Sequence, residues 1–225
     1  IQRSKGYSWR PSLTIKEIKK LIDNIRSISK DIIIFIDNCY GEFVEECEPI
    51  EVGADIAAGS LIKNPGGGLA PTGGYIVGRQ ALVEQVSNRL TAPGLGDECG
   101  PSLGVNHLLY MGLFNSPHIV GEALKTAVFA SRLFELYGFE VSPRHKERRG
   151  DIIQAIKFND VHKLLAFCRG IQKAAPVDSY VMPEPYKMPG YKDNIIMAGG
   201  TFIQGSSIEL SADAPLRPPY IGYLQ

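Results

Sequence analysis

The chain has 225 residues, of which 44% are hydrophobic and 21% are charged, a composition typical of globular proteins. Its 24 basic and 24 acidic side chains give a formal net charge of zero, which excludes electrostatic capture of nucleic acid or of an anionic membrane as the main activity. The longest strongly apolar run, residues 32–36, is far shorter than the ~18–20 residues of a membrane span. The four cysteines are widely spaced and form no CxxC pair, so we expect free thiols in the reducing cytoplasm and no structural metal site.

The first hundred residues are predicted to alternate helices with strands. Thr14 and Glu17 form a capping box, and the apolar residues that follow at helical spacing predict a helix over residues 15–28. The β-branched run at residues 31–37 is typical of a strand that is buried on both faces of a parallel sheet. Alternation of this kind predicts an α/β layer architecture. The further elements expected here are strands at residues 55–60 and 74–78 and a helix at residues 80–89.

The pattern changes after about residue 100, so a boundary between two structural units is expected near residues 100–140. Ser116 and Pro117 predict a break or kink between two helices, and Gly138 is a plausible cap for the second. The helices expected are at residues 107–114, 119–137 and 160–173, the strands at 151–158, 195–202 and 206–211, and a proline-rich loop at 177–193.

The strongest local signal is a lysine followed by glycines, in the segment GSLIKNPGGG at residues 59–68. Lys63 comes just after a predicted strand, and the glycines suggest that the backbone passes close to a ligand. A solvated loop lysine beside a flexible turn is the alternative. No Lys-Ser or Lys-Thr follows the glycines, which excludes a phosphate loop, and Pro71 excludes a dinucleotide fingerprint. The spacing of Ser60 and Lys63 also fits penicillin-interacting enzymes, but their Lys-Thr-Gly and Ser-Asp-Asn elements do not occur.

Lys63 also fits a lysine that forms a Schiff base with a cofactor aldehyde. This chemistry needs a carboxylate that keeps a pyridine nitrogen protonated, and it needs anchors for a phosphate. Asp37 ends the first predicted strand, and Tyr40 follows three residues later. The Asp37 side chain would therefore emerge at the carboxyl edge of the sheet, where ligands bind in open α/β folds. Ser60 could donate to a phosphate oxygen, although Asp37 taken alone could equally cap a turn.

Longer motifs in this sequence resemble a known family. The segments QRSKGYSWRPSLT, DNCYGEFVE, GSLIKNPGGG, PHIVGEALK and TFIQGSSIELSAD resemble the methionine gamma-lyase-like proteins that are often called aluminium resistance proteins. The resemblance extends over residues 1–225 and implies a fold-type I pyridoxal-phosphate enzyme of cysteine and methionine metabolism. In this α/β fold, residues 1–115 would be the C-terminal part of a large, mainly parallel-sheet domain that binds the cofactor. Residues 116–225 would form a smaller α+β domain.

The resemblance implies pyridoxal 5'-phosphate as the cofactor and a role for each matching residue. Lys63 would form the Schiff base and then act as the catalytic base, and Asp37 would pair with the pyridinium nitrogen. Tyr40 would donate a hydrogen bond to the phenolic oxygen of the cofactor. Ser60 would contact the phosphate.

The substrate carboxylate would be held by an arginine, since a guanidinium can form two parallel hydrogen bonds with it. Arg217 is the first candidate, with a surface arginine in a proline-rich segment as the alternative, and Arg10 is the second. Asn38 and Thr201 are weaker candidates.

These matches imply a carbon–sulfur lyase that releases a ketoacid, ammonia and a thiol from methionine, cystathionine or cysteine. An aminotransferase on the same scaffold fits the residue spacings equally well, and a non-catalytic regulatory or metal-tolerance protein is a third alternative. The chain begins with Ile1 and not with Met, and the family's glycine-containing phosphate loop and stacked aromatic ring are expected before it. We therefore expect a piece of a longer protein, whose active sites are shared between the subunits of a homodimer or homotetramer.

Overall fold

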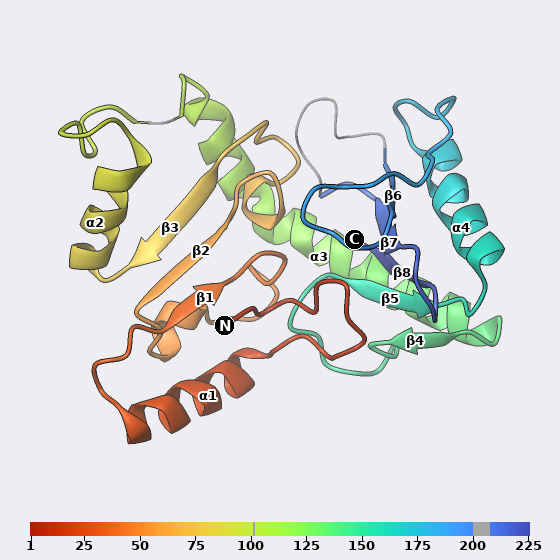
Figure 1. Cartoon of the computed structure of the whole chain (residues 1–225), viewed down its shortest axis with the longest axis horizontal. Coiled ribbons are helices and arrows are strands. Elements are labelled where there is room, and N and C mark those ends of the chain that lie inside the picture. The colour runs from red at the N-terminus through yellow and green to blue at the C-terminus, as the bar shows by residue number, and fades with distance from the viewer. Residues whose placement is uncertain (101, 200–207) are drawn as a thin grey trace.

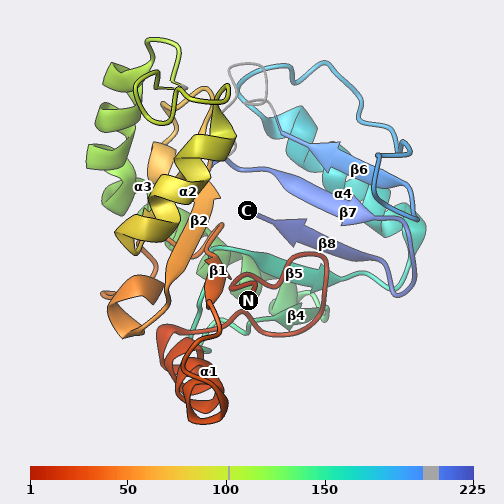
Figure 2. The same cartoon turned by 60° about the vertical axis from the view of Figure 1, so that its left-hand side comes forward.

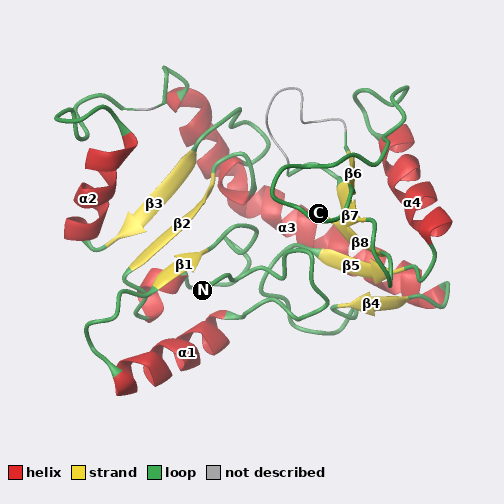
Figure 3. Ribbon diagram, in the orientation of Figure 1, coloured by secondary structure: helices red, strands yellow, loops and turns green. Residues whose placement is uncertain are grey.

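The computed structural model describes residues 1–100, 102–199 and 208–225. Two groups of elements lie side by side, each built around its own sheet, and the long helix α3 contacts both groups (Figure 1). The helices are α1 (Ile15–Ile28), α2 (Gln80–Leu90), α3 (Asn106–Leu136) and α4 (Val161–Ala174), with short 3-10 helices η1 (Pro49–Val52) and η2 (Asn64–Gly66) (Figure 3). The strands are β1 (Phe35–Asp37), β2 (Ile56–Ser60), β3 (Gly74–Gly78), β4 (Glu140–Ser142), β5 (Gln154–Lys157), β6 (Ile195–Ala198), β7 (Ala212–Pro215) and β8 (Ile221–Leu224).

The first sheet has the strand order β1-β2-β3. Strands β1 and β2 are parallel, whereas β2 and β3 are antiparallel. Helix α1 begins at the predicted capping box, in which the Thr14 side chain accepts a hydrogen bond from the backbone N–H of Glu17. The buried isoleucines of α1 pack against Ile34 and Ile36 at β1. Because β1 and β2 form the only parallel pair among the named strands of the described residues, a mainly parallel sheet stays a prediction.

The strand predicted at residues 31–37 is shorter and less buried than expected. Strand β1 covers only Phe35–Asp37. Ile34 and Ile36 are buried, but Ile33 and Phe35 are 54% and 47% exposed. Successive side chains of a strand point to opposite faces, and here α1 covers one face while the other stays half open to solvent. The expectation of burial on both faces is therefore wrong for the described residues.

The second sheet has the order β4-β5-β8-β7-β6, and all of its strand pairs are antiparallel. Helix α4 lies against one face of this sheet (Figure 2). Asp160 caps α4 by accepting a hydrogen bond from the Lys163 N–H, and Leu164 and Cys168 are fully buried in the core beneath it. A separate apolar cluster joins this sheet to the first group of elements, since it unites Tyr7 and Tyr40 with Tyr223 of β8.

Helix α3 is a single helix of 31 residues that continues through Pro117, so the predicted break is absent. The glycines after Lys63 pack against this helix. A Cβ atom on Gly112 of α3 would collide with the carbonyl oxygen of Gly66, and the Ser116 hydroxyl donates to the Pro65 carbonyl oxygen at 2.8 Å. Gly66 and Gly67 therefore lie close to a helix, and a close approach of this loop to a ligand stays a prediction.

Most other elements lie within a few residues of their predicted positions, but the strand predictions after residue 195 hold only in part. Strand β6 ends at Ala198. The strand expected at 206–211 lies partly outside the described residues. Its described part, residues 208–211, is not a strand, and β7 begins only at Ala212. Strand β4 was not predicted. All four cysteines are free thiols. None of the helices in the described ranges is long and apolar enough to cross a membrane.

Candidate active site

A cavity of about 590 Å³ lies where the two groups of elements meet. Its walls come from the N-terminal segment, from the chain that follows β1 and β2, and from β7 and β8. The two ends of the chain lie near this junction (Figure 1), and the last residue, Gln225, belongs to the wall. The acidic, phenolic and cationic side chains in these walls include Lys5, Tyr7, Arg10, Asp37, Tyr40, Lys63 and Asp213.

Asp37 and Lys63 reach the same cavity because β1 and β2 are parallel. Asp37 lies beside Ala58 in the register of the two strands, so both strands end at the same edge of the sheet. Three residues after β2 ends, Lys63 places its Nζ atom 4.3 Å from the centre of the Tyr40 ring, within the range of a cation–π contact. The structure thus brings Asp37, Tyr40 and Lys63 together, and their catalytic roles stay predictions.

Tyr40 lies in a tight loop that depends on a neighbouring segment. Its φ angle of 69° falls in the left-handed region, which is uncommon for a residue with a side chain. The next residue, Gly41, lies directly against the side chain of Arg3, where a Cβ atom would collide with the arginine. Arg3 is fully buried, so the conformation of the loop is set by this contact with the N-terminal segment.

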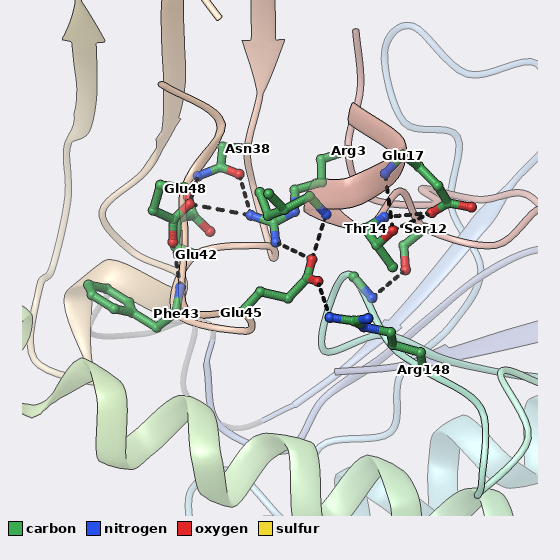
Figure 4. Close-up of polar contacts among 12 residues, drawn as sticks. Arg3, Ser12, Thr14, Glu17, Asn38, Glu42, Phe43, Glu45, Glu48 and Arg148 are labelled. Atoms are coloured by element: carbon green, nitrogen blue, oxygen red, sulfur yellow. Dashed lines mark hydrogen bonds and ion pairs between the residues drawn. The ribbon is translucent and has the colours of Figure 1, made fainter. Parts of the chain in front are cut away.

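Arg3 is held by the loop residues that follow β1, as Figure 4 shows. Its guanidinium donates to Asn38 Oδ1 at 2.9 Å, to Glu48 at 3.3 Å and to Glu45 at 3.2 Å. The exposed Arg148 also donates to Glu45. One buried positive charge is thus matched by two carboxylates and an amide, and these contacts fix the loop that presents Tyr40 to the cavity.

The phenols around the cavity are held in their protonated form. Burial raises the pKa of Tyr40 far above its ordinary value, and the nearby Asp213 carboxylate adds to this shift. The pKa of Tyr7 is raised by burial and by Asp213 in the same way. Both hydroxyl groups therefore keep their protons at neutral pH and can donate hydrogen bonds.

Asp213 is a site residue that sequence reasoning missed. Burial raises its pKa to about 6, while hydrogen bonds from Gln225 and Tyr7 and the positive charge of Lys63 oppose this shift. The segment SIELSAD contributed to the family resemblance and contains this aspartate, but nothing in the local pattern indicates that β7 would bring it beside Lys63.

The structure separates the two arginine candidates. Arg10 lines the cavity, and its guanidinium donates to the backbone carbonyl oxygens of Gln2, Ser4 and Pro11. Arg217 does not line the cavity; it pairs with Asp193 at 3.3 Å and donates to the Tyr7 carbonyl oxygen at 3.0 Å.

The remaining candidates contribute less to the described cavity. Ser60 ends β2, but its side chain is not part of the cavity wall, so a phosphate contact stays a prediction. Asn38 is buried and serves the Arg3 cluster, and Thr201 lies outside the described residues. Within the described ranges, no group of three or more His, Cys, Asp or Glu side chains could hold a metal ion.

Comparison with known proteins identifies the fold and then the family. The fold is shared with yeast cystathionine gamma-lyase, which superimposes with a TM-score of 0.54 at 15% identity, over 83% of this chain and 48% of that one. The sequence model of the family described as methionine gamma-lyase matches residues 1–225. The chain therefore belongs to the methionine gamma-lyase family, which confirms the resemblance seen in the sequence.

Closer relatives cover the whole chain. The Bacillus subtilis protein YnbB is 56% identical over 225 residues, which are 100% of this chain and 53% of YnbB. A Clostridium acetobutylicum structure, proposed to be a cystathionine beta-lyase involved in aluminium resistance, has a TM-score of 0.95 at 60% identity and covers 100% of this chain and 52% of that one. A Clostridium novyi structure described as a carbon–sulfur lyase involved in aluminium resistance has a TM-score of 0.92 at 58% identity, over 100% of this chain and 52% of that one. The chain thus spans about half the length of these relatives.

Proposed function

We propose that this chain carries the cofactor lysine of a pyridoxal 5'-phosphate-dependent carbon–sulfur lyase that acts on a sulfur amino acid. The observation that carries the proposal is the arrangement of Lys63, Asp37 and Tyr40 around one cavity. Membership of the methionine gamma-lyase family and the carbon–sulfur lyase description of the Clostridium novyi neighbour support the reaction class.

The side chains around the cavity fit this cofactor. The cofactor aldehyde reacts with an amine that is not bound to another group. Among the described residues, Lys63 Nζ takes part in no hydrogen bond or ion pair, only in the contact with the Tyr40 ring. Asp37 would hold the proton on the ring nitrogen, and the protonated Tyr40 phenol would donate to the ring oxygen. When bound, the cofactor would supply an electron sink for the negative charge that develops on substrate carbon.

The protein groups would divide the remaining work. Lys63 Nζ would take up and return protons at the carbon atoms beside the substrate amino group, and the contact with the Tyr40 ring would hold Nζ in the cavity. Arg10 is the better placed of the two arginines for the substrate carboxylate, since it lines the cavity. Ser60 does not line the cavity, so phosphate contacts would come mainly from the rest of the longer protein and from a second subunit of a homodimer or homotetramer. Four unpaired cysteines support a cytoplasmic location.

Product analysis tests the proposal. The full-length protein is incubated with pyridoxal 5'-phosphate and with methionine, cystathionine or cysteine, and thiol, ketoacid and ammonia are measured. We expect all three products from at least one substrate, none from Lys63→Arg, and normal activity from Lys187→Arg, which changes an exposed loop lysine. Ketoacid formed only with an amino acceptor would indicate an aminotransferase, and the absence of products would contradict an enzyme.

A further inference from the structure

Asp213 is a buried carboxylate with one oxygen atom that has no partner. Only 7% of the residue is exposed, and it lines the cavity from β7. Its Oδ2 atom accepts hydrogen bonds from Gln225 Nε2 at 2.8 Å and from the Tyr7 hydroxyl at 3.3 Å. Its Oδ1 atom is buried and accepts no hydrogen bond from the described residues. An unpaired buried carboxylate oxygen is costly, so Oδ1 indicates a charge or ligand that is still to be engaged.

The cationic side chains that line the cavity differ in their hydrogen bonds. Lys5 donates from Nζ to the Ser142 carbonyl oxygen at 2.7 Å, and the Arg10 guanidinium is bound to three backbone carbonyl oxygens. Among the described residues that line the cavity, Lys63 is the cation with no hydrogen bond or ion pair. A free cation and a free carboxylate oxygen thus face the same space.

We propose that Asp213 is a positioning residue for Lys63. The negative charge of Asp213 holds a proton on Lys63 Nζ, and the free Oδ1 atom of Asp213 receives the ammonium group. The two side chains form no direct ion pair in the structure, where Nζ rests over the Tyr40 ring. Both side chains line the same cavity, and the four-carbon stem of lysine is flexible. This role rests on the proposed function, in which Lys63 takes up and returns protons.

The electrostatics of the cavity agree with this role. The positive charge of Lys63 lowers the pKa of Asp213 against the effect of burial, so the two groups interact across the cavity. The other charged groups that line the cavity are Lys5, Arg10 and Asp37. The other titratable groups there are the phenols and the thiol of Tyr7, Tyr40, Tyr191, Tyr223 and Cys39.

The pH dependence of Lys63 labelling tests the proposal without any cofactor. The full-length protein is freed of bound aldehyde with hydroxylamine and treated with trace acetic anhydride at a series of pH values. Mass spectrometry then gives the labelling midpoint of the peptide that contains Lys63, because only the uncharged amine reacts. We expect Asp213→Asn to lower this midpoint by about one pH unit or more. Asp213→Glu should restore it, and Asp97→Asn, at an exposed position, should leave it unchanged.

A merely structural role for Asp213 gives a different result. In that case Asp213→Asn would lower the unfolding midpoint in urea but leave the labelling midpoint of Lys63 where it is in the wild type, which overturns the proposal. If the asparagine variant does not fold, Asp213→Ser provides a second neutral side chain for the same comparison. Failure of the proposed function would look different, since the wild type would then form no borohydride-stable adduct with pyridoxal 5'-phosphate, whatever the labelling midpoint.

Discussion

Replacing Arg3 tests how the loop that carries Tyr40 is held in place. The Arg3 side chain is fully buried, and its guanidinium binds Asn38, Glu45 and Glu48. The Arg3→Met variant keeps much of the volume of the side chain but removes the charge and these hydrogen bonds. It leaves Glu45, whose side chain is only 10% exposed, without its buried partner.

The expected loss of stability follows from this burial. Removing one partner of a buried ion pair leaves an uncompensated charge and costs about 3–5 kcal/mol. Arg148 provides a matched control, because it binds the same Glu45 at the same distance of 3.2 Å but is 73% exposed. An exposed pair contributes less than about 1 kcal/mol, so Arg148→Met should cost little.

Urea unfolding of the full-length protein at pH 7 and one fixed protein concentration measures both effects. We expect Arg3→Met to lose several times more unfolding free energy than Arg148→Met, with an unchanged dependence on urea. Equal losses in the two variants, or a loss below about 1 kcal/mol for Arg3→Met, would refute the reasoning that burial makes this cluster important.

Two further predictions concern packing and pH. Gly112→Ala places a Cβ against the carbonyl oxygen of Gly66 and should lower the stability measured by thermal unfolding by about 1–3 kcal/mol. In the same helix, Gly121→Ala meets open space and should stabilise the helix by about 1 kcal/mol. If Gly121→Ala were the less stable of the two variants, the observed packing would be contradicted. Burial raises the pKa of Glu42, which accepts a hydrogen bond from Tyr75, to about 7. The folded state therefore binds this proton more tightly than the unfolded state, so its contribution to stability is complete below pH 4.5 and is lost as the pH rises through 7. Between pH 4.5 and 8, the unfolding free energy measured in urea should fall by on the order of 3 kcal/mol more in the wild type than in Glu42→Gln. A difference in unfolding free energy between the two proteins that stays constant over this pH range would refute the prediction.

The sequence predicted the site residues that lie at the ends of neighbouring strands. Asp37 ends one strand and Lys63 follows the next, so their meeting requires only that β1 and β2 run parallel. Tyr40 belongs to the loop that leaves β1 and is carried along with Asp37. These relations extend over a few dozen residues and follow from the pattern of buried strands.

The sequence could not predict contributions that depend on how the two groups of elements pack. Asp213 comes from an antiparallel sheet, and only the packing of that sheet against the first group brings it beside Lys63. The engagement of Arg217 with Asp193 and with a backbone carbonyl oxygen is equally non-local. The close approach of Gly66 to Gly112 could not be predicted either, because a glycine pattern shows that something lies close but not what it is.

The most direct test of the central claim is to find which lysine binds the cofactor. The full-length protein is treated with pyridoxal 5'-phosphate and then with borohydride, which makes the bond to the lysine permanent, and its peptides are mapped by mass spectrometry. The account predicts a pyridoxyl group on the peptide that contains Lys63, and none on that peptide in Lys63→Arg. An adduct on a different lysine, or no adduct in the wild type, would contradict it.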